Sequence, residues 1–237
     1  GKTYPEGTNL HNATTVQIKA MTAREEDILT SANLIEKGVV IDQLLKSLIV
    51  TKVDYGDIFI GDKNAIMLAA RIFGYGKTYN NEVTCPNCST KEDTPFDLTQ
   101  LKYKKIDPKK YNRNNIFEFT LPNAERKIEF KMLKHKDEEM IQKELDGINK
   151  AMKGLSRDIT TRLRYQIVSV DGEKDPKFVN NFVLNEFFAM DSRAFREHYN
   201  DLTPDVDFNV GFVCNNCGHI EEEMALPISV NFFWPSR

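Results

Sequence analysis

The stretch TCPNCSTKEDTPFDL (residues 84–98) contains two of the four cysteines of this 237-residue chain, Cys85 and Cys88. The other two, Cys214 and Cys217, stand in VCNNCGH (residues 213–219) and repeat the CxxC spacing. Two thiolates separated by two residues can bind one ion, because the short loop between them turns back on itself. We call each such loop a knuckle. Together the two knuckles supply four sulfur ligands, the preferred set for structural zinc.

Other uses of four cysteines are disulfides, free thiols and redox chemistry. Disulfides are rare in the cytosol, and the N-terminal sequence has no apolar segment that could act as a secretory signal. A redox motif explains one CxxC but not two copies with Asn, Pro and Gly in and beside them. We therefore predict a structural Zn²⁺, with a degenerate site of unligated cysteines as the alternative and with iron in place of zinc left open. The predicted ligands are Cys85, Cys88, Cys214 and Cys217.

A catalytic role for this metal is not expected. A catalytic zinc keeps one coordination position open for water and has fewer protein ligands, often His and Glu. The chain contains no HExxH motif, and His219, directly after the second knuckle, is expected near the metal or on the surface. Nucleophile elbows, phosphate loops and dinucleotide fingerprints are also missing from the sequence. We predict that the protein is not an enzyme.

Short strand patterns flank both knuckles. Residues 81–84 and 96–98 flank the first knuckle, and residues 208–213 and 220–226 flank the second. Each knuckle is therefore predicted to join the arms of a hairpin, and one zinc ion would clamp both hairpins into a zinc ribbon. Zinc binding is worth on the order of 10 kcal/mol in small peptides. The entropy cost of closing the long intervening loop grows only slowly with its length.

The remaining sequence alternates between helical and strand patterns. Thr22 and Glu25 have the spacing of a capping box at the start of a helix that Gly38 ends. Further helices are expected over about 39–50, 62–73, 137–153, 157–168, 176–188 and 191–200, and a β-hairpin over 116–132. The helix over 39–50 is expected to have an apolar face of Ile41, Leu44, Leu45, Leu48 and Ile49, and Asp175 is expected to cap the helix that begins at Pro176. These patterns predict an α+β fold with a helical N-terminal region, a zinc ribbon formed by two distant CxxC knuckles, and an inserted β-hairpin plus helices.

The predicted domain organisation follows from these elements. It comprises a flexible N-terminal arm (1–20), a helical region (21–80), the zinc ribbon with a C-terminal aromatic tail (81–98 and 205–237), and an inserted α+β region (99–204). The chain begins with Gly rather than Met, so we expect a trimmed or processed N-terminus. The net charge of −3 does not favour nucleic acid or an acidic membrane as a partner. No apolar run approaches the roughly 18 residues that span a bilayer, so we expect a soluble, cytosolic protein without a membrane partner.

Several short segments follow one another in a recognisable order. The first is MTAREEDILT (residues 21–30). Further along the chain come GYG (74–76), the first CxxC, IVSVDG (167–172), the second CxxC with its glycine, and FFW (232–234). In this order, from about residue 21 to the end of the chain, the segments resemble a family of tail baseplate hub and hub-assembly proteins of contractile-tailed (myovirus-type) bacteriophages. The resemblance does not include the N-terminal arm.

The resemblance implies a structural or assembly role in the phage tail baseplate rather than catalysis. It implies contacts with other baseplate or hub subunits, several copies per assembly, and a location in the virion and, during assembly, in the host cytoplasm. Independently of it, the aromatic C-terminus predicts a docking role, because chain ends fray unless they are anchored. The candidate partner-binding residues are Phe232, Phe233 and Trp234. The alternative is that this tail packs into the protein's own core.

A zinc-ribbon protein that binds nucleic acid is the main alternative function. Basic side chains interleaved with aromatic rings can bind single strands. The supporting residues are Lys102, Tyr103, Lys104, Lys105, Lys109, Lys110, Tyr111 and Arg113. However, such a run is usually a solvated loop, and the glutamates at 221–223 would repel phosphates. We therefore do not expect a nucleic-acid partner.

Overall fold

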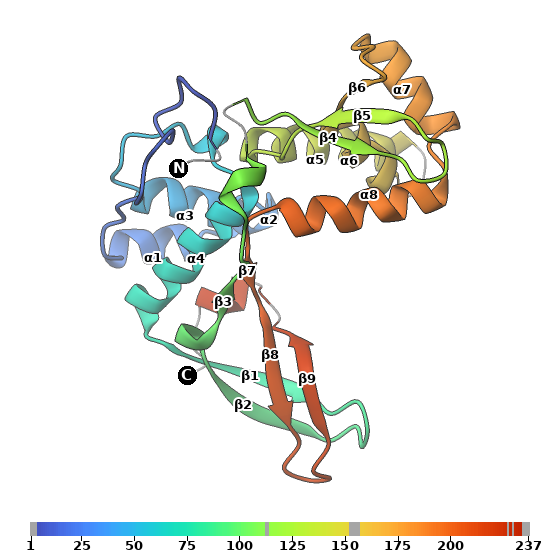
Figure 1. The fold of residues 1–237 in the computed structure, drawn as a ribbon. Helices are drawn as coiled ribbons and strands as arrows, with labels where there is room; N and C mark the ends of the chain where they lie inside the picture. The colour runs from blue at the N-terminus through green and yellow to red at the C-terminus, as the bar shows by residue number, and fades with distance from the viewer. Residues whose placement is uncertain (1–3, 112–113, 152–156, 227, 229, 234–237) are drawn as a thin grey trace. The chain divides into compact units, whose positions relative to one another are not determined.

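The computed structural model describes residues 4–111, 114–151, 157–226, 228 and 230–233. Within these residues the chain combines helices with small antiparallel sheets (Figure 1), so the expected α+β class is confirmed. The chain divides into two compact units. Unit 1 is drawn from residues 1–15, 53–63 and 105–204, and unit 2 from residues 16–52, 64–104 and 205–237. None of the described helices is long and apolar enough to cross a bilayer.

Unit 2 contains the N-terminal helices. They are α1 (Ala23–Thr30), α2 (Ala32–Glu36), α3 (Val40–Leu48) and most of α4 (Ile60–Tyr75). The sequence predicts one helix up to Gly38, but the helix is interrupted at Ser31, whose backbone is extended (φ −68°, ψ 106°). Gly38 has a positive φ of 68° and follows α2, as a helix-ending glycine should. Leu44, Leu45 and Leu48 of α3 are fully buried and form the apolar face that the sequence predicts.

The start of α1 is stabilised by a buried carboxylate. Glu25 accepts hydrogen bonds from the backbone N–H of Thr22 at 3.0 Å and from its hydroxyl at 2.7 Å, so the predicted capping spacing is used. The same carboxylate accepts from Lys19 and from Ser47, both at 2.7 Å. The hydrogen bond from Lys19, together with those from Thr22 and Ser47, lowers the pKa of Glu25 well below its usual range. The carboxylate therefore remains ionised although it is fully buried.

The strands of unit 2 form two hairpins and a short bridge. Strand β1 (Thr78–Thr84) pairs antiparallel with β2 (Lys91–Asp97), β8 (Asn209–Val213) with β9 (Ile220–Ala225), and β3 (Lys102–Tyr103) with β7 (Val206–Asp207). Strand β2 begins earlier than the sequence predicts. Its charged start and Pro95 weaken the strand pattern, but an edge strand tolerates proline because one side of it needs no ladder hydrogen bond.

Unit 1 contains a three-stranded antiparallel sheet in the order β4-β5-β6, with helices on more than one side of it in the view of Figure 1. The strands are β4 (Phe117–Thr120), β5 (Lys127–Phe130) and β6 (Ile167–Val170), and the helices are α5 (His135–Ala151), α6 (Asp158–Gln166), α7 (Pro176–Asn185) and α8 (Ala189–Leu202). The helix that the sequence predicts through Val168 ends at Gln166, because the following residues pair with β5. The last two residues of the predicted helix 137–153 lie outside the described residues. Asp175 caps α7 through the N–H of Phe178, as its position before Pro176 predicts.

Aromatic side chains fill the core of unit 1. The Phe195 ring of α8 lies 5.1 Å from that of Phe130 and 6.0 Å from that of Phe119, measured between centroids. Asp191, fully buried at the start of α8, accepts hydrogen bonds from the backbone of Asn123 and Ala124 in the β4–β5 turn. One helix therefore supplies both the apolar cover of the sheet and the anchor of its hairpin turn.

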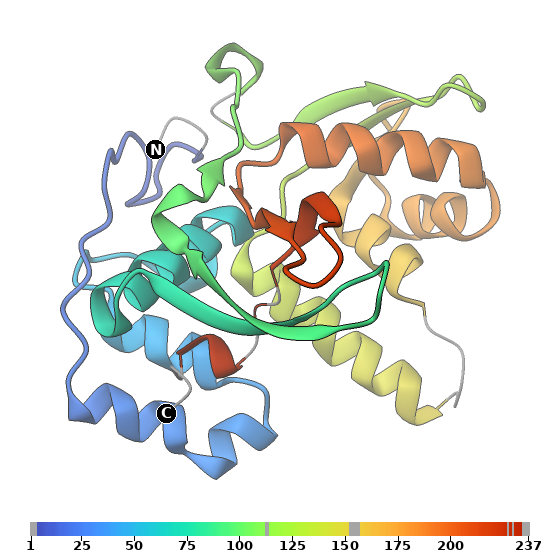
Figure 2. The same cartoon turned by 90° about the horizontal axis from the view of Figure 1, so that it is seen from below.

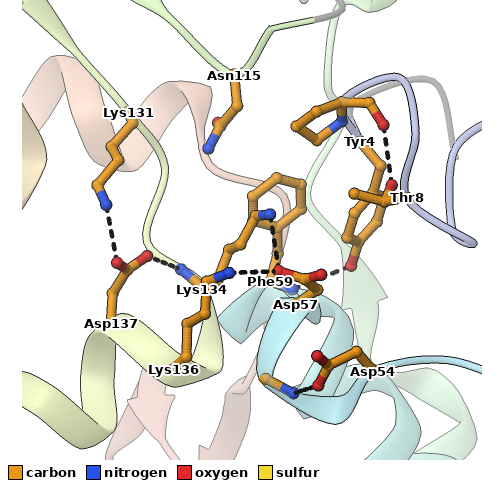
Figure 3. Close-up of polar contacts among 12 residues, drawn as sticks. Tyr4, Thr8, Asp54, Asp57, Phe59, Asn115, Lys131, Lys134, Lys136 and Asp137 are labelled. Atoms are coloured by element: carbon orange, nitrogen blue, oxygen red, sulfur yellow. Dashed lines mark hydrogen bonds and ion pairs between the residues drawn. The ribbon is translucent and has the colours of Figure 1, made fainter.

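The polar N-terminal sequence predicts a flexible arm, but within the described residues 4–15 the side chains of Tyr4 and Leu10 are buried in unit 1. Tyr4 is 2% exposed, and its hydroxyl donates to Asp62 at 2.6 Å and accepts from the N–H of Phe59 at 3.0 Å. Burial, reinforced by Asp62, raises the pKa of Tyr4 above its usual range. Figure 3 shows Tyr4 beside Asp57, whose carboxylate accepts from two lysines. These are Lys134 at 3.0 Å and Lys136 at 2.8 Å.

The part of the chain that the structure describes also contains four short 3₁₀ helices. They are η1 (Tyr55–Asp57), η2 (Leu98–Gln100), η3 (Pro108–Lys110) and η4 (Val230–Phe233).

Candidate metal centre

The four cysteine sulfurs meet at one place in unit 2. The loops of the β1–β2 and β8–β9 hairpins lie next to each other (Figures 1 and 2), and all four Sγ atoms are within 4.8 Å of one another. Sulfurs of opposite knuckles lie 3.7 Å apart for Cys85 and Cys217 and 3.6 Å apart for Cys88 and Cys214. A tetrahedral ion with metal–sulfur bonds of about 2.3 Å places its sulfurs about 3.8 Å apart. The cluster therefore has the size of a four-thiolate metal site, as the CxxC spacing predicts.

The two knuckles have the same backbone hydrogen bonds. Cys85 donates its N–H to the carbonyl of Thr90, and Cys214 donates to the carbonyl of His219, each at 2.9 Å. In both cases the acceptor lies five residues after the donor, on the other side of the loop. The first cysteine of each pair is thus fixed where its strand enters the knuckle.

Each knuckle also contains one residue with a left-handed backbone. Ser89 has φ 59° and Gly218 has φ 70°, and both follow the first cysteine by four residues. Their N–H groups donate to the carbonyls of Cys85 and Cys214, again at 2.9 Å. Glycine adopts this conformation without steric cost, whereas serine does not. The sequence indicates the turn at Gly218 but not the equivalent one at Ser89.

The burial of the four thiols is uneven. Cys85 and Cys214 are each 1% exposed, Cys88 is half-buried and Cys217 is exposed. The hydrogen bond between the Cys88 sulfur and the Thr90 hydroxyl, 3.3 Å apart, is the main cause that lowers the pKa of Cys88 to about 5. The backbone amide of Cys217 lowers the pKa of Cys214, but burial and the adjacent thiols outweigh it and raise that pKa to about 12. Closely packed thiols resist joint ionisation, whereas a divalent ion deprotonates the thiols that it coordinates.

Polar side chains connect the knuckles to each other. Asn87 donates from Nδ2 to the sulfur of Cys217 at 3.6 Å, and Asn216 donates to the sulfur of Cys88 at 3.7 Å. Asn216 also donates to the hydroxyl of Thr90 at 3.0 Å. These contacts join residues more than a hundred positions apart in the chain. Sequence analysis does not identify them, although an asparagine precedes the second cysteine in both motifs.

Asn215 and Glu92 form a second connection between the hairpins. The carboxylate of Glu92 accepts from the Asn215 side chain at 2.6 Å and from its backbone N–H at 3.2 Å. His219 is not one of the four clustered residues; its Nε2 lies 3.8 Å from the carboxylate of Glu221.

The described part of the C-terminal tail packs within unit 2. Phe232 and Phe233 are both fully buried, and Trp234 lies outside the described residues. Arg71, which is 1% exposed, donates to the carbonyl of Phe232 at 2.6 Å and places its guanidinium 5.8 Å from the centre of that ring. Burial lowers the pKa of Arg71. A neighbouring protein could reach the two Phe rings only by displacing the tail, and the anchoring role of Arg71 is not apparent from the sequence.

The basic segment considered for nucleic-acid binding is exposed in its described part. The side chains of Lys102, Lys104, Lys105, Lys109 and Lys110 are exposed, and Arg113 lies outside the described residues. Tyr103 is 63% exposed, but Tyr111 is half-buried and its hydroxyl donates to the carbonyl of Leu202. Only one of the two tyrosines is thus fully available to stack on a base.

A cleft of about 430 Å³ lies between the bases of the two hairpins. Phe96, Leu101 and Val210 supply apolar lining. The charged groups around it are Asp97, Asp207, Glu222, Glu223 and Lys102. Because the carboxylates outnumber the lysine, this part of the surface repels phosphate groups.

The comparison with protein families confirms the resemblance to a phage baseplate family, and the match also includes most of the N-terminal arm, which the resemblance left out. The model of the family described as T4 bacteriophage base plate protein matches residues 3–234, almost the whole chain. No curated protein and no solved structure matches the chain. The chain belongs to the T4 bacteriophage base plate protein family.

Proposed function

We propose that this chain is a scaffold or assembly component of a phage tail baseplate that acts through protein–protein contacts, with one structural Zn²⁺ fixing its hairpin region. Membership of the family supports a structural role in the baseplate, a location in the virion tail and assembly with other baseplate proteins. The observation that carries the metal proposal is the convergence of four thiols from two knuckles, all within 4.8 Å of one another.

The chemistry of the ligands favours zinc in a purely structural role. Four thiolates fill a tetrahedral shell and leave no position for a water or substrate. Cys85, Cys88, Cys214 and Cys217 would each contribute one sulfur. The two hairpins would then form a zinc ribbon, whose ends the ion holds together. An all-sulfur site also suits iron, so the metal must be identified by analysis.

In this proposal the ribbon (81–98 and 205–237) fixes the two ends of the inserted region (99–204). The helical region (21–80) and the insertion then offer surfaces to other baseplate or hub subunits. We retain the aromatic tail of Phe232, Phe233 and Trp234 as a further contact, which would require the buried rings to leave their site in unit 2. Several copies per baseplate and a stage in the host cytoplasm during assembly belong to the same proposal.

The test uses Cys88→Ser and Cys214→Ser in the full chain. Asn80→Ala is the control, because Asn80 lies on the exposed face of β1, in the same hairpin as Cys88. Elemental analysis of purified protein should give one zinc per wild-type and control chain and a loss of zinc in both cysteine variants. In infected cells that supply only the variant, incorporation into tails should fail for both cysteine variants and succeed for the control.

Two results would contradict this proposal in separate ways. A wild-type protein without stoichiometric metal would remove the zinc ribbon but leave the baseplate role. Normal incorporation of both cysteine variants would show that the metal site does not serve assembly. Iron at one equivalent would replace zinc in the same four-thiolate site.

A further inference from the structure

The two more exposed cysteines of the cluster are the ones whose sulfurs contact asparagine side chains. Cys85 and Cys214 are buried by the protein, whereas Cys88 is half-buried and Cys217 is exposed. The amide of Asn216 lies against Cys88, and the amide of Asn87 lies against Cys217. Each asparagine thus covers the second cysteine of the opposite knuckle.

We infer that Asn87 and Asn216 are a reciprocal pair of positioning residues that retain the metal by covering Cys217 and Cys88 from opposite knuckles. This inference rests on the proposed zinc site. The arrangement is nearly two-fold symmetric, since both asparagines directly precede the second cysteine of their own knuckle and donate across to the other. Neither amide would bind the metal itself.

Amide hydrogen bonds to a coordinated thiolate affect the site in two ways. They withdraw charge from the sulfur, so that the thiolate competes less well for a proton. They also fix the orientation of the ligand, and loss of such outer contacts in metal sites typically lowers metal affinity about 10–100-fold. Because Cys88 and Cys217 are less buried than Cys85 and Cys214, we expect them to be the first cysteines that acid, an oxidant or a chelator reaches.

The two contacts are not equally well supported. The amide of Asn216 also donates to Thr90 at 3.0 Å, and the neighbouring Asn215 is held by Glu92. For Asn87, the contact that fixes the amide is the one with Cys217 at 3.6 Å. Loss of Asn216 removes contacts with two side chains of the other knuckle, whereas loss of Asn87 removes one. The Asn216 variant should therefore weaken metal binding more than the Asn87 variant.

The experiment compares Asn87→Ala, Asn216→Ala and the control Asn80→Ala in the full chain. Zinc affinity is measured by competition with a chromophoric chelator. We expect about 10–100-fold weaker zinc binding for the first two variants and wild-type affinity for the control. Asn216→Ala should bind zinc more weakly than Asn87→Ala. Asn87→Asp and Asn216→Asp keep the shape of the side chain but lack the donor, and should lose at least as much affinity.

A second measurement separates this role from general loosening of the hairpins. Each protein is treated with iodoacetamide, and the alkylation rate of each cysteine is followed by mass spectrometry. Asn87→Ala should speed alkylation most at Cys217, and Asn216→Ala should speed it most at Cys88. This crossed pattern follows only from cover supplied by the opposite knuckle.

Equal acceleration at all four cysteines, or acceleration within the mutated knuckle alone, would overturn the inference. Unchanged zinc affinity in both alanine variants would also overturn it. If the wild-type protein holds no metal, the proposed zinc site fails. The crossed alkylation pattern, measured on that metal-free protein, would still support the covering role, and its absence would reject it.

Discussion

The hairpin region of unit 2 and the three-stranded sheet of unit 1 are both antiparallel, but their buried side chains differ greatly. In the strands of the hairpins the buried side chains are Tyr79, Val83, Phe96 and Phe212. In unit 1 the strands bury Phe117, Ile128, Phe130, Ile167, Ser169 and Val170, and α8 adds Phe195. The sheet therefore has a continuous apolar core, and the hairpins have a small one.

This difference gives a physical reason for the position of the proposed metal ligands. Isolated two-stranded hairpins are marginally stable in water, and three or more strands or a packed helix are needed for independent stability. Small cores are commonly supplemented by a metal or another cross-link. The four cysteines lie at the ends of the two hairpins, while the described part of the sheet in unit 1 contains no cysteine. Apolar burial stabilises one region, and we propose that metal coordination stabilises the other.

Among the following tests, removal of the proposed zinc should have the largest effect, and it should act on the hairpins. Structural zinc contributes on the order of 10 kcal/mol in small peptides, so a strong chelator should open the hairpins. Hydrogen exchange followed by mass spectrometry should show loss of protection in β1, β2, β8 and β9. Protection in β4, β5 and β6 should remain, and equal loss in both regions would show that the metal does not act locally.

Phe195→Ala should produce the second largest effect, a loss of stability in the sheet region of unit 1. Phe195 is fully buried against Phe130, and removal of a buried phenylalanine costs about 3–5 kcal/mol. Chemical denaturation should show this loss of unfolding free energy, while the zinc content of the folded protein stays unchanged.

Phe188→Ala is the matched control for that prediction. Phe188 precedes α8 and is 53% exposed, so its removal should change the unfolding free energy by less than about 0.5 kcal/mol. Equal effects of the two substitutions would contradict the assignment of the aromatic core.

The smallest effects are expected from two substitutions that compare the backbone of the two knuckles. No atom lies within 4 Å of a Cβ placed on Gly218, so Gly218→Ala meets no clash, but its φ of 70° makes alanine unfavourable by about 1 kcal/mol. Ser89→Gly removes the same strain from the first knuckle, offset by about 0.5–1 kcal/mol of backbone entropy. Hydrogen exchange at the knuckle amides should show faster opening for the first variant and little change for the second. Similar destabilisation by both would mean that the knuckles are not equivalent.

The sequence predicts most elements of this fold because their patterns are local. The capping spacing of Thr22 and Glu25, the apolar face of α3 and the cap of α7 by Asp175 all lie within a few residues and occur as predicted. The errors occur where distant contacts outweigh local preference. Residues 167–168 continue a helical pattern, but pairing with β5 places them in a strand. Tyr4 lies in a polar stretch, but Asp62 and Phe59 give its hydroxyl partners in the interior of unit 1.

In the candidate metal centre, too, the sequence predicts the local features and not the contacts between distant segments. The CxxC spacing identifies four sulfurs that can share an ion, because each pair depends only on its own short loop. The outer contacts of Asn87, Asn216 and Glu92 could not be predicted in this way. Each joins one knuckle to the other, and an asparagine or glutamate in a polar loop has no pattern that indicates its partner.

By itself, the sequence determined the α+β class, the two knuckles, the local helix signals and the resemblance to the baseplate family. The tertiary structure alone decided which sulfurs lie opposite each other, which asparagine covers which cysteine, and that Arg71 anchors the carbonyl of Phe232. The physical reason is the range of the interactions. Turn geometry and apolar periodicity act over a few residues, whereas these contacts form only after the chain has brought distant segments together.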